Sequence, residues 1–248
     1  MRAMILAAGL GTRLRPLTDD RPKALVEVAG RTLLEITLRR FASFGISEVI
    51  VNVHHFADMV AEYLHRNNNF GMRVEISRED ILLDTGGGLK KAAWFFLEEG
   101  HAHESFLLHN VDVLSTIDLC RMAAFHQQNQ ALATLAAQNR ETSRYLLFDE
   151  QRQLCGRQAG HAGKREIVRP SREMQPLAFS GVHVISPRLL SMMVEDGVFS
   201  IINSYLRLAG EGEKILAFPA DEFYWRDLGR PENVAQAERD VNQQVLQL

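Results

Sequence analysis

The chain has 248 residues, of which 46% are hydrophobic and 24% are charged, and its formal net charge at pH 7 is −3. These values are typical of an ordinary soluble globular protein and give no sign of the basic excess expected of a nucleic-acid-binding surface. The two cysteines, Cys120 and Cys155, make no disulfide framework and have no metal-site spacing. No apolar run approaches the ~18 residues of a membrane span, and the N-terminus has no signal-peptide core. We therefore expect a cytoplasmic protein without a membrane or nucleic-acid partner.

The first half of the chain alternates between strand-like and helix-like segments. Short apolar or β-branched runs predict the strands, and apolar residues at helical spacing between them predict the helices. The predicted strands are 2–7, 48–53, 72–77, 105–109 and 131–138. One predicted helix covers 88–97. This alternation with short connections predicts an α/β fold: a single domain with a mostly parallel mixed sheet and helices on both faces.

The second half is less regular. Strand-like segments occur at 145–149, 178–185, 215–218 and 224–228, and a polar, basic stretch covers 156–172. Ser200 can cap a helix, and 231–248 resembles a terminal helix with a proline near its start. We see no linker or internal repeat, so the prediction is one domain over residues 1–248.

The beginning of the chain carries the strongest motif. An apolar strand enters a loop that holds two glycines and an arginine, and a lysine follows ten residues after that arginine. Glycines let backbone N–H groups approach an anion, and nearby cations neutralise its charge. A Walker-type loop is excluded because no Gly-Lys-Ser/Thr follows. A dinucleotide fingerprint is excluded because Leu14 stands where the third glycine is required. The loop therefore predicts a polyphosphate site.

This block resembles the signature of the sugar-phosphate nucleotidyltransferases, the NDP-sugar pyrophosphorylases. That family has an apolar strand, then Ala-Gly-x-Gly-Thr-Arg, a proline, and Pro-Lys with an apolar residue. The chain is most similar to the short uridylyl- and guanylyltransferases that act on N-acetylmuramate, mannose or heptose 1-phosphates. The resemblance implies that Arg13 neutralises the β- and γ-phosphates and that Lys23 contacts the α-phosphate. It also implies that the loop backbone cradles the nucleotide at Ala8, Gly9, Gly11 and Thr12.

Two aspartates match the family's acidic positions. Asp112 follows the strand over 106–109, in a segment that resembles an apolar run ending in Gly-Asp, although Val111 replaces the glycine. Asp227 lies in a segment that resembles the late Trp-x-Asp-x-Gly motif. The resemblance implies that both carboxylates hold Mg²⁺, which prefers one or two carboxylates plus phosphate oxygens. A helix-capping role for Asp112 and a turn role for Asp227 are the alternatives.

Base and sugar recognition are assigned to weaker motifs. The resemblance implies that a second glycine cluster, with Gly86 and Gly87, lines the nucleobase, and Asp84 either accepts from the base or faces water. A helix cap and turn are the alternative for this cluster. On the sugar side, Arg169 stands where the family's Glu-Lys-Pro segment has lysine. Arg144 and Gly181 are further candidates for the sugar-phosphate site, and a solvated loop is the alternative for 156–172.

These motifs imply a Mg²⁺-dependent enzyme that transfers a nucleotidyl group from a nucleoside triphosphate to a sugar 1-phosphate and releases pyrophosphate. The acceptor phosphate has a second pKa near 6, so the reaction needs no general base at neutral pH. Residues 1–139 would form the nucleotide-binding half, 140–230 the sugar-phosphate-binding half, and 231–248 a C-terminal helix. Two alternatives are a cytidylyltransferase for a phosphorylated alcohol such as phosphocholine and a non-catalytic nucleotide-sugar-binding regulatory subunit. The base, the sugar and a homo-oligomeric state stay open.

Overall fold

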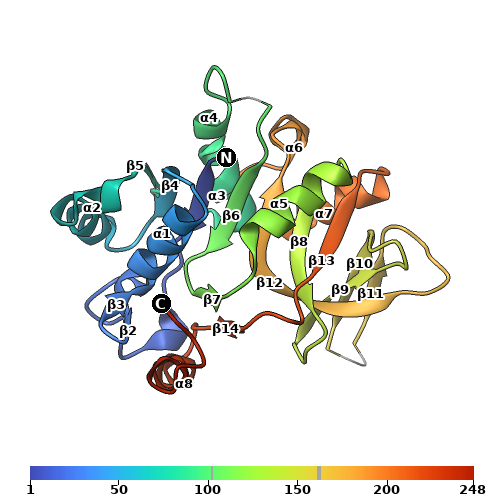
Figure 1. Cartoon of the computed structure of the whole chain (residues 1–248). Helices are drawn as coiled ribbons and strands as arrows, with labels where there is room; N and C mark the ends of the chain where they lie inside the picture. The colour runs from blue at the N-terminus through green and yellow to red at the C-terminus, as the bar shows by residue number, and fades with distance from the viewer. Residues whose placement is uncertain (102, 161–162) are drawn as a thin grey trace.

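A ten-stranded sheet forms the centre of the chain in the computed structural model, which describes residues 1–101, 103–160 and 163–248 (Figure 1). The path of hydrogen-bonded strands is β11-β10-β9-β12-β6-β1-β4-β5, and β8 links β12 to β13. These strands are β1 (Ala3–Leu6), β4 (Glu48–Val53), β5 (Arg73–Arg78), β6 (Phe106–Asn110), β8 (Ala133–Gln138), β9 (Arg144–Phe148), β10 (Leu154–Ala159), β11 (Arg165–Ile167), β12 (Gln175–Ile185) and β13 (Ile215–Pro219). Two small sheets pair β2 (Glu27–Val28) with β3 (Arg31–Thr32) and β7 (Val113–Ser115) with β14 (Trp225–Asp227).

The strands β6, β1, β4 and β5 run parallel to one another, as the alternating pattern predicts. The central strand β1 is buried on both faces, because Ala3 and Ile5 pack in one apolar cluster and Met4 and Leu6 in the other. A strand with apolar residues at every position suits this place in a parallel sheet. The predicted α/β fold is therefore confirmed, and its parallel pairs lie mainly in the first half.

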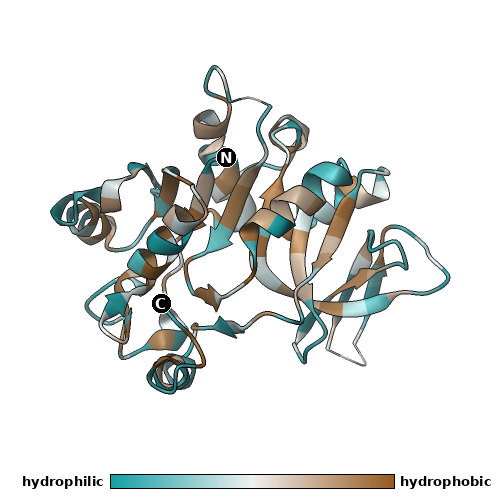
Figure 2. Ribbon diagram, in the orientation of Figure 1, coloured by the Kyte–Doolittle hydropathy of each residue, from teal (hydrophilic) through white to brown (hydrophobic). Residues whose placement is uncertain are grey.

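Helices cover both faces of the sheet (Figure 1). One apolar cluster contains α1 (Leu33–Ser43), α2 (Ala57–Arg66), α5 (Leu119–Gln128) and α8 (Pro231–Asn242). The other contains α3 (Asp84–Lys91), α4 (Ala93–Phe96), α6 (Arg188–Met192) and α7 (Ile201–Gly210). Figure 2 shows hydrophobic residues along the central strands and hydrophilic ones on the outer turns. Burial of apolar area from both sides is the main stabilising contribution to this architecture.

The second half forms an antiparallel wing through the long strand β12. This strand pairs with β6 near its end, with β9 near its beginning and with β8 along its other edge, each time antiparallel. The β12–β8 register shifts between Phe179 and His183, and Gly181 has φ +75° within this irregularity. A β-bulge bends a strand locally. The bulge lies beside the end of β6 and therefore beside the candidate site.

Two predicted helix boundaries differ from the structure. Helix α3 begins at Asp84 rather than at residue 88, because the N–H groups of Gly86 and Gly87 donate to the carbonyl of Phe199 and hold the glycine cluster in the first turns. The terminal helix α8 ends at Asn242, and Gln244 beyond it has φ +57°. No helix in the described ranges is both long enough and apolar enough to cross a membrane.

Candidate active site

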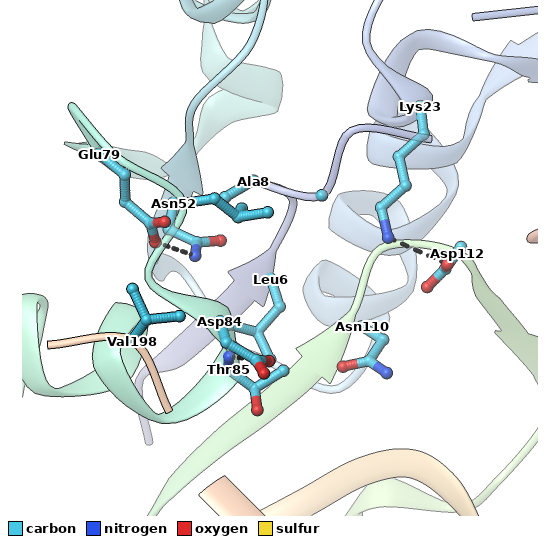
Figure 3. A pocket seen from close by; sticks show the side chains of 12 residues that line it. Leu6, Ala8, Lys23, Asn52, Glu79, Asp84, Thr85, Asn110, Asp112 and Val198 are labelled. Atoms are coloured by element: carbon cyan, nitrogen blue, oxygen red, sulfur yellow. Dashed lines mark hydrogen bonds and ion pairs between the residues drawn. The ribbon is translucent and has the colours of Figure 1, made fainter. Parts of the chain in front are cut away.

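A cavity of about 330 Å³ lies at the carboxyl ends of the parallel strands β1, β4 and β6 (Figure 3). Open α/β sheets bind ligands at this edge, because loops from several strands meet there. The cavity is lined by Leu6, Ala8, Gly9, Lys23, Asn52, Glu79, Leu82, Asp84, Thr85, Asn110, Asp112 and Val198. Of the residues predicted from the sequence, Ala8, Gly9, Lys23, Asp84 and Asp112 are in this lining.

The predicted phosphate loop folds back on Lys23. A Cβ built on Gly9 would lie 3.2 Å from Nζ of Lys23, so glycine leaves the lysine room to pass beside the loop. Gly11 has φ +65° and packs against Thr18, whose hydroxyl donates to the Gly11 carbonyl over 2.8 Å. Thr12 and Arg13 follow in a short 3₁₀ helix, Thr12–Leu14. The loop thus directs one lysine into the cavity.

Lys23 and Asp112 form an ion pair inside the cavity, with 3.0 Å between Nζ and Oδ2 (Figure 3). Both side chains are 15% exposed, so the pair is shielded from bulk water. Burial raises the pKa of Asp112, but the ammonium of Lys23, with help from Arg13, outweighs it and leaves the pKa below its usual value. Asp112 is therefore an anion beside a cation.

Asp227 is brought next to Asp112 by the small sheet of β7 and β14. In this sheet Asp227 lies opposite Val113, and Leu228 donates its N–H to the Asp112 carbonyl over 2.7 Å. The Gly229 N–H donates to Oδ1 of Asp227 over 2.7 Å. A Cβ on Gly229 would lie 2.7 Å from that oxygen and 3.0 Å from Nη2 of Arg13. Arg13 and Asp227 therefore border the same glycine.

Asp112 and Asp227 are the two carboxylates that the sequence assigns to a magnesium ion. Mg²⁺ is usually held by one or two carboxylates together with waters and substrate phosphates, rather than by a full cage of protein ligands. The described residues hold no cluster of three or more histidines, cysteines or acids. Asp112 and Asp227 lie on hydrogen-bonded neighbouring segments, and a metal site between their carboxylates stays a prediction.

The second glycine cluster has a packing role in the structure. A Cβ on Gly86 would lie 2.3 Å from the ring of Phe199, and one on Gly87 would lie 2.4 Å from the Gly197 carbonyl. These contacts require glycine whether or not a base binds nearby. Asp84 lines the cavity and accepts the Thr85 N–H over 2.6 Å. Contact of this cluster with the nucleobase stays a prediction.

Four polar residues in the lining are absent from the sequence-based assignment: Asn52, Glu79, Thr85 and Asn110. Asn52 and Glu79 are 2% and 4% exposed, and Asn52 Nδ2 donates to Glu79 Oε1 over 2.7 Å. Asn52 and Asn110 lie near the carboxyl ends of β4 and β6. A polar side chain at the carboxyl end of a buried strand is a signal that could have indicated them.

The sugar-phosphate candidates lie in different places. Arg144 lines a second cavity of about 780 Å³, which also includes Phe179 and Ser200. Arg169 donates to Gln153 and pairs with Asp149 at 3.8 Å, outside both linings. Gly181 is in neither lining and packs beside the end of β6, where a Cβ would lie 2.7 Å from Cγ2 of Val113 and 3.0 Å from Nδ2 of Asn110.

Val111, which replaces the usual glycine, is 1% exposed in the apolar cluster of α1 and α5. Its side chain is not in the cavity lining.

Arg140 is a further residue that the sequence analysis did not assign. Its guanidinium lies 3.5 Å from the centre of the Trp225 ring, and Nη2 donates to the Phe179 carbonyl over 2.9 Å. The indole N–H of Trp225 donates to the Ser180 carbonyl over 2.8 Å. Burial lowers the pKa of Arg140 below its usual value, and the nearby charge of Asp227 offsets only part of this shift. Arg140 therefore joins β14 to the bulge of β12.

The fold and this site define an α/β protein in which a glycine loop, a lysine and an aspartate line one cavity at the carboxyl edge of the sheet. A sequence model of the family described as "Nucleotidyl transferase" matches residues 2–244. The chain is 35% identical over 245 residues to N-acetylmuramate alpha-1-phosphate uridylyltransferase of Caulobacter vibrioides. This alignment covers 95% of each of the two chains. The chain belongs to the nucleotidyl transferase family.

Further relatives agree with this placement. Mannose-1-phosphate guanylyltransferase of Mycobacterium tuberculosis is 28% identical over 96% of this chain, which spans 64% of that protein's length. The solved structure of HddC from Yersinia pseudotuberculosis, complexed with GMP-PN, superposes with a TM-score of 0.74 over 97% of this chain and 99% of that chain. At 22% identity, that likeness shows the fold. The prediction of an enzyme of the sugar-1-phosphate nucleotidyltransferase class is confirmed.

Proposed function

We propose that this enzyme transfers a uridylyl group from UTP to N-acetylmuramate 1-phosphate and releases pyrophosphate, with Mg²⁺ as its metal. The observation that carries the transfer is the buried Lys23–Asp112 pair at the carboxyl edge of the sheet, with Asp227 at the neighbouring backbone position. The choice of donor and acceptor is supported by the relative that matches 95% of both chains at 35% identity. A nucleoside triphosphate donor favours a cytoplasmic setting.

The residues of the site can do this chemistry without a general base. The acceptor phosphate is largely ionised at neutral pH, so it can attack the α-phosphorus directly and displace pyrophosphate. The barrier is the approach of two anions, which positioned cations lower. Lys23 would hold the α-phosphate, and Arg13 would neutralise the phosphates that leave. Bound by Asp112 and Asp227, Mg²⁺ would neutralise charge on the phosphate oxygens.

The second cavity supports an acceptor that carries an anion besides its phosphate. Four cationic residues line it, Arg144, Arg157, Lys164 and Arg165, against one carboxylate, Glu166. That carboxylate is already paired with Arg157 at 2.7 Å. The lactyl carboxylate of N-acetylmuramate is such an anion, whereas N-acetylglucosamine and mannose 1-phosphates have none.

The decisive experiment is a pyrophosphate-release screen with Mg²⁺. Each of UTP, GTP, CTP and dTTP is paired with the 1-phosphates of N-acetylmuramate, N-acetylglucosamine and mannose, and with phosphocholine. The expected result is the highest kcat/KM for UTP with N-acetylmuramate 1-phosphate. N-acetylglucosamine 1-phosphate is the matched control, because it lacks only the lactyl group. A preference for GTP with mannose 1-phosphate would overturn the substrate assignment, and release with phosphocholine alone would favour the phosphorylated-alcohol alternative.

A further inference from the structure

We propose that Asn52 and Glu79 are positioning residues, which form a hydrogen-bonded relay that holds the phosphate loop and the loop before α3 in register for the nucleotide. This inference rests on the proposed nucleotide site. It concerns residues for which neither the motifs nor the relatives' names suggest a role. Both residues line the cavity, and Figure 3 shows them side by side, joined by a hydrogen bond.

The relay has three bonds in series. The Ala7 N–H donates to Asn52 Oδ1 over 2.7 Å, at the start of the phosphate loop. Asn52 Nδ2 donates to Glu79 Oε1 over 2.7 Å. The Leu83 N–H, directly before α3, donates to Glu79 Oε2 over 2.9 Å. Three elements far apart in sequence therefore meet through two side chains, each less than 5% exposed.

The polarity of this relay is determined by its two ends. Each end is a backbone N–H, which can only donate. Asn52 must therefore present its oxygen to Ala7, and its NH₂ then faces Glu79. Because Glu79 receives one donor from Asn52 and another from Leu83, it must accept at both oxygens. An ionised carboxylate does this, and glutamine does not.

Glu79 is held by its main chain as well as by its side chain. Each of its carboxylate oxygens already accepts an N–H, and no ion pair joins Glu79 to a cation in the described parts of the chain. The Glu79 N–H donates to the Val53 carbonyl over 2.8 Å, and the Glu79 carbonyl lies 2.8 Å from His54 Nδ1. With main chain and side chain both held, Glu79 has a fixed orientation between the two loops, as a positioning residue requires.

Helix α3 packs directly on the relay. A Cβ on Gly88 would lie 2.7 Å from Asn52 Nδ2 and 2.7 Å from Glu79 Oε1, so only glycine lets the helix approach this closely. Buried polar groups that are fully satisfied hold a structure in one arrangement, and a partly satisfied network is destabilising. The relay therefore sets where Ala8 and Gly9 stand relative to Asp84 and Thr85, which line the same cavity.

The polarity argument provides a test by rescue. Asn52→Asp keeps an acceptor for Ala7 but places two carboxylates together. Glu79→Gln places an NH₂ group either against Asn52 Nδ2 or against the Leu83 N–H. In the double variant N52D/E79Q, the introduced carboxylate would accept from Ala7 and from the introduced amide, whose oxygen would accept from Leu83. Every bond is restored, and the net charge equals that of the original chain.

The readouts are KM for each substrate, kcat, the Kd of Mg·UTP without acceptor, and the thermal unfolding midpoint. Each single variant is expected to raise KM and Kd for the nucleotide about tenfold, the order expected for a buried unpaired polar group. KM for the acceptor should change less than about twofold. The double variant should return nucleotide binding to within about threefold of the original. Glu62→Gln, in an exposed pair with Arg66, is the control and should change nothing.

A double variant no better than the weaker single variant would overturn the relay. So would single variants that lower the unfolding midpoint while nucleotide binding stays unchanged, because that result describes structural support alone. The Kd of Mg·UTP is measured without acceptor or turnover. If the substrate screen fails but single variants weaken nucleotide binding and the double variant restores it, the relay stands and only the proposed reaction is wrong.

Discussion

Leu228 donates its backbone N–H to the carbonyl oxygen of Asp112 over 2.7 Å, and this bond makes the backbone segments of Asp112 and Asp227 direct neighbours. It continues the pairing in which Asp227 lies opposite Val113 in β14 and β7. The late segment of the chain is thereby joined to the loop after β6. Metal binding, if it uses both aspartates, depends on this small sheet as much as on the carboxylates themselves.

Asp112→Asn and Asp227→Asn should each lower kcat at least about 100-fold, because each removes a charge that would hold the metal ion at the reacting phosphates. The measurement is pyrophosphate release at increasing Mg²⁺, with the unfolding midpoint followed in parallel. The control is Asp118→Asn. Asp118 caps α5 by accepting the Arg121 N–H, and asparagine caps helices equally well. Near-original turnover in either site variant would refute the metal assignment.

Lys23→Met should reduce kcat about 100-fold or more, since it removes the cation that reaches into the cavity beside Gly9. It should also lower the unfolding midpoint, because Asp112 would remain shielded without its partner. Arg15→Met is the matched control, as Arg15 is exposed and pairs only with Asp19 at 3.4 Å among the described residues. The measurement is the steady-state kcat of Lys23→Met and of Arg15→Met. Equal activity in the two variants would contradict a role for Lys23 at the α-phosphate.

Gly181→Ala should impair both folding and activity. The new Cβ would lie 2.7 Å from Val113 and 3.0 Å from Asn110, at a residue whose φ is +75°. Gly212→Ala separates the two causes, because Gly212 has φ +96° and nothing within 4 Å of a built Cβ. Backbone strain alone costs about 1 kcal/mol at such a position. We expect Gly181→Ala to lose more unfolding free energy than Gly212→Ala, and only Gly181→Ala to show a reduced kcat/KM. Equal effects in the two variants would mean that backbone strain alone explains the result.

Buried histidines predict a loss of stability in mild acid. Burial lowers the pKa of His126 to about 4, that of His109 to about 4 and that of His183 to about 3. In the unfolded chain a histidine has a pKa of about 6.5, so below that pH the unfolded state binds more protons than the folded state. The contribution of these buried histidines to the free energy of unfolding is therefore fully present above about pH 6.5. It is lost progressively as the pH decreases toward about 4.

The test is denaturant unfolding of His126→Gln between pH 7.5 and 4.5. Removing one such histidine should reduce the pH dependence of the unfolding free energy by up to about 1.4 kcal/mol per pH unit. His65→Gln, at an exposed position on α2, should leave the slope as it is. An identical slope for both variants would show that His126 titrates normally in the folded protein.

The sequence predicted those features that depend on residues close together along the chain. Apolar strands flanked by glycines and helical periodicity indicated the α/β fold, and the position of Asp112 after a buried strand indicated the ligand edge. Predictions were weaker where a residue's surroundings come from distant segments. The start of α3 depends on the Phe199 carbonyl, and the side chain of Arg169 is held by Gln153 and Asp149 rather than at either cavity.

By itself, the sequence determined the class of fold and the family, because strand burial and motif chemistry depend on neighbours along the chain. Only the tertiary structure decided that Asp227 stands beside Asp112, that Arg140 stacks on Trp225, and that the Asn52–Glu79 relay joins two loops. The physical reason is the same in each case. A hydrogen bond or ring contact forms within about 3–6 Å, and which distant residues come that close is decided by strand pairing and packing.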